Sequence, residues 1–346
     1  MAIDSHKIHR WYRDVLSDFI EKGQNQLHEN DIELVDLDSG EINTISVPIC
    51  ESQNIGKNMC IDEKQIGAEF YTIISNRETG KLVLMASTTK SSELIKAVSP
   101  IMEELSCVEI INRDLASCYR VFCNHVMPHA KQVGDKFHVI KLQLDAVQAV
   151  RISQKREIDT KKREAHKEFK DIEKQRKEAC LKNSEVYKKR RFVYNEKKLS
   201  NMETPSEILR RSRYLLYKFP DQWTEKQQDR ANVLFAEFPV LKQTYVLSNQ
   251  FRSWYSKSNI GKHKIALEKE LFSWYDNVEE SGIVDLMNFS STVERNEEYI
   301  INYFNTNGST NAMAENRNGK IKKFINSNQG TRDQDFFFFR LKKYFT

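Results

Sequence analysis

The sequence predicts an α/β protein whose core is interrupted by a large all-helical insertion. Short runs of β-branched and aromatic residues alternate with helical periodicity in residues 58–145, which is the pattern of a sheet covered by helices. From residue 146 to residue 306 the periodicity is mainly helical. The chain has 346 residues, of which 39% are apolar, so it can bury a sizeable core.

Residues 1–57 are expected to form an N-terminal helix and a connector. Apolar side chains recur at helical spacing through residues 1–25, which predicts one amphipathic helix. The residues that follow are polar, and an Asp-Ser-Gly turn at residues 38–40 separates short alternating runs at 32–37 and 42–47. This pattern predicts a connector or a small hairpin.

Three strands are expected at the start of the core. The short apolar run Met59–Ile61 leads into Asp62. The segments 70–75 and 81–86 are joined by a turn that ends in glycine. These features predict one strand followed by a hairpin.

A helix and a parallel strand are expected next. Ser91 or Ser92 can cap a helix over residues 93–105, which is a crossover of the right length to return the chain to the sheet. The β-branched run 108–111 then predicts a buried strand, and Asp114 stands just past its C-terminal end. In open α/β sheets the chemically active groups gather where strands end, so Asp114 is expected in a site.

A second helix, a strand and a long helix complete the first part of the core. Residues 116–126 have helical periodicity, and Pro128 ends that helix. A short strand ends at Asp135, and His138 opens the long helix. The resulting order βββαβαβα is the ribonuclease H-like arrangement, in which the first and fourth strands are neighbours. The carboxylates that follow those two strands are therefore expected to converge.

The stretch from His138 to Tyr194 is predicted to be helical and increasingly basic. Residues 151–200 hold 18 Lys and Arg residues against 9 Asp and Glu residues. This local excess makes a polyanionic partner plausible. For an isolated charge run, a solvated charged helix is the simpler interpretation.

Residues 146–306 are expected to form this basic helix and a helical insertion. Capping boxes at Thr204–Glu207 and Thr224–Gln227 mark the start of two helices. Further amphipathic helices are expected at about 240–255, 263–279 and 293–304.

Residues 307–346 are expected to return to the core with two helices. In the first of them Glu315, Gly319 and Lys322 share one face, which suits a DNA backbone phosphate. The last helix is expected to begin at Thr331. It carries acidic residues in its first turn and basic residues in its last turn, and so matches the helix dipole.

Taken together, these features resemble the DDE transposases of bacterial insertion sequences, in the subgroup that has an Asp-Arg/Lys-Phe-His block and is distantly Mutator-like. The resemblance rests on Asp62, Asp114 with Tyr119 behind it, the Asp-Lys-Phe-His block at 135–138, the helical insertion and the segment 314–322. It covers about Tyr12 to the C-terminus. Each motif is weak alone, and their order makes the resemblance specific.

By this resemblance the chain is a transposase that cleaves DNA and transfers strands at the ends of an insertion sequence. The resemblance implies that Asp62, Asp114 and Glu315 are the catalytic and metal-binding carboxylates. Three carboxylates around one point repel one another unless divalent cations neutralise them, which implies two Mg²⁺ or Mn²⁺ ions and two-metal phosphoryl transfer. The residues expected to orient the site or to contact DNA are Asp135, His138, Lys320, Lys322 and Lys323.

Each site residue also has a plainer interpretation. Glu63 can replace Asp62 as the first ligand, and Asp114 can cap the helix that follows it. Glu315 can be an ordinary surface residue. His138 can bind metal directly, although orienting a neighbour or contacting DNA is favoured.

Two further questions stay open from the sequence. Aromatic clusters around Trp254 and Trp274 favour packing between helices over stacking on an unpaired base. The alternative functions are a ribonuclease H-like nuclease that does not transfer strands, and a catalytically inactive DNA-binding relic.

Double-stranded DNA, at the element ends and at the target, is the expected partner of a homo-oligomer. Relatives commonly begin with a zinc ribbon and a helix-turn-helix, whereas the six cysteines here include no C-x-x-C pair. A separate end-recognition protein is therefore expected. No apolar run approaches the ~18 residues of a membrane span, which predicts a cytoplasmic, nucleoid-associated protein without a membrane partner.

Overall fold

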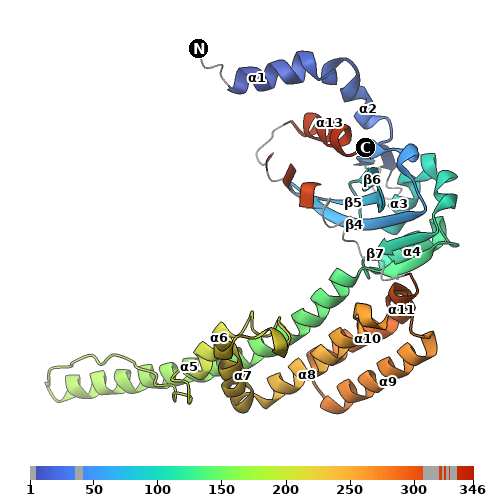
Figure 1. Cartoon of the computed structure of the whole chain (residues 1–346). Coiled ribbons are helices and arrows are strands. Elements are labelled where there is room, and N and C mark those ends of the chain that lie inside the picture. The colour runs from blue at the N-terminus through green and yellow to red at the C-terminus, as the bar shows by residue number, and fades with distance from the viewer. Residues whose placement is uncertain (1–4, 36–41, 307–318, 322, 325–326, 328–332) are drawn as a thin grey trace. The chain divides into compact units, whose positions relative to one another are not determined.

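The computed structural model describes residues 5–35, 42–306, 319–321, 323–324, 327 and 333–346. The chain divides into two compact units (Figure 1). The first unit comprises Met1–Val139 and Asn296–Thr346, and the second comprises Ile140–Arg295. The second unit is thus inserted, in sequence, between two parts of the first.

The first unit is built on a six-stranded sheet with the strand order β3-β6-β5-β4-β7-β8. Its strands are β3 (Ile49–Cys50), β4 (Asn58–Ile66), β5 (Glu69–Asn76), β6 (Leu82–Ala86), β7 (Ile110–Arg113) and β8 (Lys131–Gly134). β4 pairs antiparallel with β5 and parallel with β7, and β7 pairs parallel with β8. The predicted adjacency of the first and fourth core strands, β4 and β7, is confirmed.

Two apolar clusters cover the two faces of this sheet. On one face, Ile61 and Ile111 pack with α3 (Ser91–Ala97) and α4 (Ser117–Val126). On the other face, Ile73 packs with α13 (Gln334–Phe345). Because side chains alternate along a strand, β4 contributes residues to both clusters. Its first residues are buried on both faces of the sheet, whereas buried and more exposed residues mix farther along the strand.

The N-terminal segment differs from the single helix predicted over residues 1–25. It consists of α1 (Ser5–Trp11), the π-helical segments η1 (Tyr12–Leu16) and η2 (Phe19–Gly23), and α2 (Gln24–His28). Asp18, with φ 62°, breaks the helix between η1 and η2. Asp tolerates this left-handed conformation better than most residues do, so the helix can be interrupted at Asp18 although the apolar spacing continues past it.

The connector contains the hairpin strands β1 (Ile32–Val35) and β2 (Ile42–Ile45), which pair antiparallel. The turn expected at residues 38–40 lies outside the described residues. The sequence did not indicate β3, a two-residue strand that adds to the edge of the main sheet beside β6. Such a short strand carries too few residues for a recognisable period.

The crossover helix is shorter than predicted. α3 ends at Ala97, and the 3₁₀ turns Ser99–Ile101 and Glu104–Cys107 replace the expected continuation to residue 105. Pro100 accounts for the difference, because proline cannot donate the hydrogen bond that would continue the helix.

Helices make up most of the second unit, and its described residues contain no strand. α5 (Lys136–Lys182) begins in the first unit and enters the second at Ile140. It is followed by α6 (Pro205–Arg211), α7 (Glu225–Glu237), α8 (Pro239–Trp254), α9 (Lys264–Ser281) and α10 (Val284–Arg295). Both predicted capping boxes, Thr204–Glu207 and Thr224–Gln227, are present at the starts of α6 and α7.

Two helix ends in this region differ from the predictions. α5 stops at Lys182, and Ser184, with φ 54°, turns the chain out of the helix, so residues 185–199 are not helical. The helix expected at 293–304 is divided at Asn296 between α10 and α11 (Glu297–Asn305), and α11 belongs to the first unit.

None of the described helices is long and apolar enough to cross a membrane.

Candidate active site

Asp62 and Asp114 follow a pair of residues that face each other on adjacent parallel strands. Ile61 of β4 is the register partner of Arg113 of β7. Each aspartate is the residue that follows one of these two partners in the chain, and neighbouring strands lie about 4.8 Å apart. The two carboxylates therefore come from neighbouring positions of the sheet, as the sequence predicted.

Asp135 extends this row onto the third parallel strand. Arg113 is also the register partner of Gly134 of β8, and the Asp135 amide donates a hydrogen bond to the Arg113 carbonyl at 2.8 Å. Asp62, Asp114 and Asp135 thus follow corresponding positions on β4, β7 and β8. Only Asp62 lies inside its strand, because β4 continues to Ile66, beyond the end that the sequence suggested.

Asp62 and Glu63 project from opposite faces of β4. Asp62 pairs with Ile73, which belongs to the cluster with α13, whereas Glu63 pairs with Thr72, whose hydroxyl lies 3.3 Å from that of Tyr119 on α4. Register partners in an antiparallel pair share a face. The two candidates for the first ligand are therefore on different sides of the sheet.

Lys64 is a neighbour of Asp62 that the sequence analysis missed. Its Nζ lies 2.7 Å from Oδ2 of Asp62, and both side chains are largely buried. The Glu63 amide donates to Oδ1 of the same carboxylate at 2.8 Å. Residues two apart on a strand share a face, so the spacing of Asp62 and Lys64 could have indicated this ion pair.

Asp114 and Asp135 also make local contacts with the backbone. Oδ1 of Asp114 accepts a hydrogen bond from the Leu115 amide at 2.5 Å. Oδ1 of Asp135 accepts from the Phe137 amide at 3.0 Å and so caps α5. These contacts hold both carboxylates near the ends of their strands and leave the second oxygen of each to other interactions.

Nδ1 of His138 forms a hydrogen bond with Oδ2 of Asp135, and the two atoms are 3.0 Å apart. This hydrogen bond raises the pKa of His138, burial opposes the rise, and the negative charges of Asp114 and Asp62 add to it. All three aspartates are therefore close enough to act electrostatically on one imidazole.

The pKa of His138 is higher in the folded protein than in the unfolded chain, where it is about 6.5. Protonated His138 therefore stabilises the folded protein fully at a pH below the unfolded-state pKa. This stabilisation is lost as the pH rises through the folded-state pKa. We expect His138→Ala to lower the free energy of unfolding more at acidic than at alkaline pH. Urea unfolding at both pH values measures this difference. The exposed His129, replaced by Ala, is the control, and an equal loss at both pH values would contradict the assignment.

Arg113 is fully buried directly before Asp114, and no sequence pattern indicated its role. Its Nε donates to Oε1 of Gln132 at 2.7 Å, and its Nη1 donates to the Asp114 carbonyl at 2.8 Å. Its guanidinium carbon lies 4.2 Å from the ring centroid of Tyr299 on α11. Burial lowers the pKa of this guanidinium.

These contacts fix the backbone of Asp114 to β8 and to α11. Asn302 of α11 donates to the Gln132 carbonyl at 2.9 Å, and Lys136 Nζ lies 3.1 Å from the Tyr303 hydroxyl. α11 is the first element after the chain returns from the second unit. Its packing against β8 thus holds α11 beside the row of aspartates, within the first unit.

The remaining predicted site residues belong to the C-terminal part. Glu315 and Lys322 lie outside the described residues. Lys320 and Lys323 are exposed, and Ile321 between them is buried in the cluster that contains Ile73. This short helical stretch therefore packs on the sheet face from which Asp62 projects.

In the described part of the chain, no group of three His, Cys, Asp or Glu side chains has an arrangement that could hold a metal ion. The donor chemistry nevertheless fits a hard cation, because Mg²⁺ in proteins is commonly bound by one or two carboxylates together with substrate phosphates. Asp62 and Asp114 supply two carboxylates at neighbouring sheet positions, and the ammonium of Lys64 lies against the Asp62 carboxylate.

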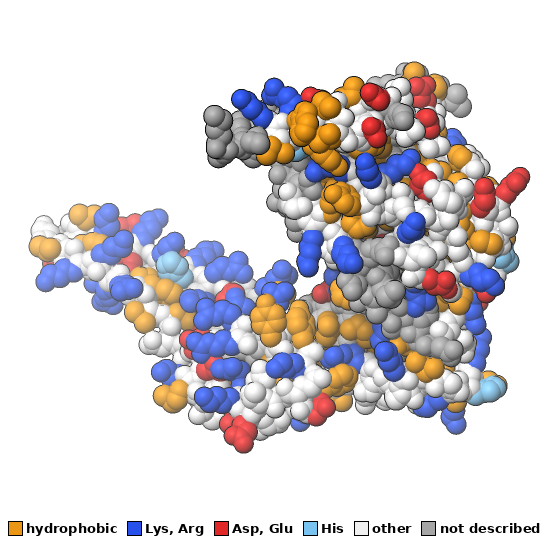
Figure 2. Space-filling view, turned by 45° about the horizontal axis from the view of Figure 1, so that its top comes forward, with side chains coloured by type: hydrophobic (Ala, Val, Ile, Leu, Met, Phe, Trp, Pro, Cys, Tyr) orange, Lys and Arg blue, Asp and Glu red, His pale blue; other side chains and the backbone are white. Residues whose placement is uncertain are grey.

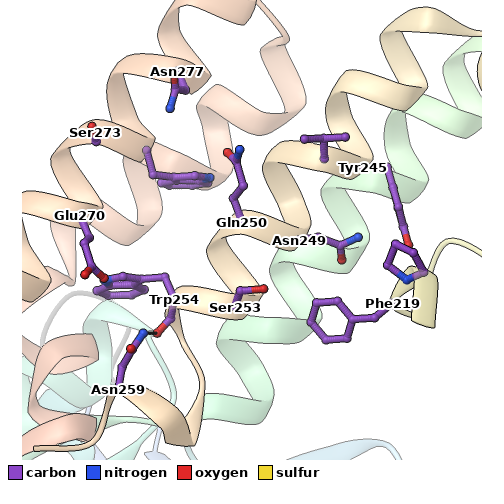
Figure 3. A pocket seen from close by; sticks show the side chains of 13 residues that line it. Phe219, Tyr245, Asn249, Gln250, Ser253, Trp254, Asn259, Glu270, Ser273 and Asn277 are labelled. Atoms are coloured by element: carbon purple, nitrogen blue, oxygen red, sulfur yellow. Dashed lines mark hydrogen bonds between the residues drawn. The ribbon is translucent and has the colours of Figure 1, made fainter. Parts of the chain in front are cut away.

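A pocket of about 710 Å³ lies elsewhere, within the second unit, between α8 and α9 (Figure 3). Trp254 and Trp274 line it and are almost fully buried. Their indole nitrogens donate to backbone carbonyls of Leu267 and Leu247 at 3.1 and 2.9 Å. The prediction that these tryptophans form a core between helices is confirmed.

The chain matches the model of a known protein family. A family model described as transposase, of the DDE type named ISL3, matches residues 59–341. No curated protein and no solved structure matches the chain. The matched range begins on β4, just before Asp62, and ends within α13.

Proposed function

The chain belongs to this ISL3 family of DDE transposases, and we propose that it cleaves DNA at the ends of an insertion sequence and joins the freed strands to a target duplex. The observation that carries the proposal is the placement of Asp62 and Asp114 at neighbouring positions of adjacent parallel strands. The strand order of the sheet supports a ribonuclease H-like core, in which such a carboxylate pair is the centre of the chemistry.

Asp62 and Asp114, with Glu315 as the third carboxylate, are the proposed ligands of two Mg²⁺ or Mn²⁺ ions. When bound, such ions neutralise phosphate charge and activate the attacking oxygen in an in-line displacement. Asp62 is preferred to Glu63 because it projects from the sheet face on which Ile321, near Glu315 in sequence, is buried.

The neighbouring residues of the chain orient this site. Asp135 holds the His138 imidazole, and Arg113 fixes the backbone carbonyl of Asp114. Lys64 forms an ion pair with Asp62 and so holds its carboxylate in place. Lys320 and Lys323 are exposed on the proposed Glu315 helix and offer cationic contacts to the DNA backbone, as Lys322 would.

The experiment that tests the proposed function uses a duplex with the element's own ends. In Mg²⁺, the protein should nick this duplex and transfer the freed 3′ end into a second, labelled duplex. Cleavage without transfer would favour a nuclease over a transposase. Binding without cleavage, together with no effect of Asp114→Asn on any readout, would favour an inactive relic.

The basic surface of the second unit is the proposed site of contact with DNA backbone. Lys and Arg side chains gather along α5 (Figure 2). The segment after Ser184 is fixed back onto this helix, because Glu173 accepts hydrogen bonds from the Tyr187 hydroxyl and the Arg190 amide, and Phe192 stacks on His166. The basic helix α5 and the basic segment after Ser184 thus lie side by side.

We expect this surface to bind DNA through phosphates, with steep salt dependence and little sequence preference. Replacing the exposed Lys188, Lys189 and Arg191 with Ala should weaken binding and reduce the slope of log K against log salt by up to about three, because each of these side chains can neutralise one phosphate. The control replaces three exposed lysines of α7, α8 and α9, namely Lys226, Lys242 and Lys269. An unchanged slope would exclude this surface as the DNA-binding site.

Selectivity for the element's ends is proposed to need a zinc-ribbon protein, because these 346 residues contain no C-x-x-C pair. The same titration on end-sequence and scrambled duplexes tests this. A hundredfold preference by the chain alone, about 2.7 kcal/mol, would show that it reads bases itself.

A further inference from the structure

Residues 270–294 of the second unit carry charge of one sign only. They include six Asp and Glu residues and no Lys, Arg or His, in a chain whose net charge is +5. They form the C-terminal part of α9 and nearly all of α10, which lie side by side (Figure 1). Such a surface repels DNA phosphates, so the proposed function leaves it without a role.

The two helices form a hairpin. Only Gly282 and Ile283 separate them, and Gly282 has φ 61°, a conformation that glycine adopts without strain. The ring centroids of Trp274 on α9 and Phe289 on α10 are 5.8 Å apart, so the helices pack along their length. A connection this short makes neighbouring helices antiparallel. Residues that lie far before the turn on α9 are therefore opposite residues that lie far after it on α10.

A groove of about 370 Å³ lies between α9 and α10. Its apolar and acidic lining residues recur at helical spacing and are Phe272, Tyr275, Asp276, Glu279, Met287 and Glu294. Phe272 and Met287 are 57% and 39% exposed, so the groove offers apolar surface to a ligand. In the antiparallel hairpin, Phe272 is nearer to Glu294, and Met287 is nearer to Glu279. Each end of the groove therefore combines one apolar side chain with one carboxylate.

The three carboxylates of the groove are exposed and have no ion-pair partner among the described residues. By contrast, Glu268 and Glu270 of α9 pair with Lys264 and Lys262. Carboxylates that line one groove repel one another, and a cationic ligand removes this repulsion. No group of three described acidic, His or Cys side chains is placed to hold a metal ion, which favours a ligand with several separate cationic groups.

We propose that this groove binds a basic amphipathic helix of a partner protein. Apolar side chains of that helix, three or four residues apart, pack on Phe272 and Met287. Lys or Arg side chains that flank them pair with Asp276, Glu279 and Glu294. Charge complementarity selects this occupant, because DNA has the wrong sign and an uncharged helix leaves the three carboxylates unpaired. The proposal does not rest on the cleavage chemistry.

The first test measures binding of a fluorescein-labelled peptide to the full chain by fluorescence anisotropy. The probe is a helical peptide of Leu and Lys, about 18 residues long, with its leucines on one face. The combined change Asp276→Asn, Glu279→Gln and Glu294→Gln should weaken binding about tenfold, because three ion pairs are lost. Phe272→Ser should also weaken it about tenfold, because it removes an apolar contact.

The matched control removes three exposed carboxylates from α5 and α7 of the same unit. It combines Glu157→Gln, Glu164→Gln and Asp229→Asn, and it should leave the dissociation constant unchanged. A peptide with Glu in place of every Lys should not bind the parent chain. Far-ultraviolet circular dichroism and the thermal midpoint verify that each variant is folded.

The second test locates the bound peptide on the chain. A carbodiimide joins the lysine amines of the peptide directly to carboxylates that they contact, and mass spectrometry of the digested product identifies the joined residues. Cross-links should fall on Asp276, Glu279 or Glu294. The Leu and Lys peptide should lose these cross-links when Phe272 is replaced by Ser, although all three carboxylates remain.

Three outcomes would overturn the proposal. The first is that the peptide does not bind, or that the carboxylate and Phe272 variants bind it as tightly as the parent does. The second is that the carboxylate variant binds DNA more weakly than the parent, which would make DNA the occupant. The third is that the parent self-associates in sedimentation velocity and the carboxylate variant does not, which would make a second copy the occupant. None of these readouts depends on cleavage, so they are independent of the proposed function.

Discussion

Replacing Asp114 with Asn is expected to abolish Mg²⁺-dependent DNA cleavage while leaving DNA binding nearly unchanged. The amide keeps the shape of the side chain and its hydrogen bond from the Leu115 amide, but it removes the charge that would hold a cation. Loss of a metal site removes several kcal/mol of transition-state stabilisation, so the cleavage rate should fall about a thousandfold or more.

The register of β4 and β7 extends this expectation to Asp62. Asp62→Asn should cause a loss of similar size, and the double variant should be little worse than either single one, because ligands of one site act as a unit. Asp171→Asn, at an exposed position of α5, is the control. Cleavage by Asp114→Asn at the parent's rate would reduce Asp114 to a structural residue.

Replacing Arg113 with Ala should lower the free energy of unfolding of the first unit by about 3–5 kcal/mol. The change removes a fully buried large side chain, and such truncations cost that much. It also leaves Oε1 of Gln132 and the Asp114 carbonyl without their donor. Arg113→Lys keeps the charge but loses the planar fork over Tyr299, so an intermediate loss is expected.

Urea unfolding measures these differences, with Lys131→Ala, at an exposed position of β8, as the control. The control should change the free energy of unfolding by less than about 0.5 kcal/mol. A loss below about 1 kcal/mol for Arg113→Ala would show that the buried guanidinium contributes little to the stability of the sheet.

The central sheet could be predicted because its elements follow local rules. The β-branched run before Asp114, the glycine turn of the β5–β6 hairpin and the helical crossover each indicate their own element. Parallel crossovers then restrict the strand order, and so the adjacency of Asp62 and Asp114 was predictable without any long-range information.

The predictions that were wrong or missing depend on features that a short stretch of sequence does not reveal. Asp18 breaks a segment whose apolar spacing is that of a continuous helix. The non-helical segment after Ser184 has a composition that suits a helix, and the packing of its Phe192 against His166 overrides that propensity. Arg113 and Tyr299 meet only because α11 returns to β8 after the whole insertion, so no sequence period relates them.

The most direct test of the central claim is the position at which a bound metal ion cuts the protein backbone. Fe²⁺ in place of Mg²⁺, with ascorbate and peroxide, generates radicals that cleave peptide bonds next to the ion. Mass spectrometry of the fragments should locate cuts near Asp62 and Asp114, with a third near Glu315. Mg²⁺ should suppress these cuts, and Asp62→Asn and Asp114→Asn should each remove them. Cuts confined to other parts of the chain, or cuts unchanged in both variants, would contradict the account.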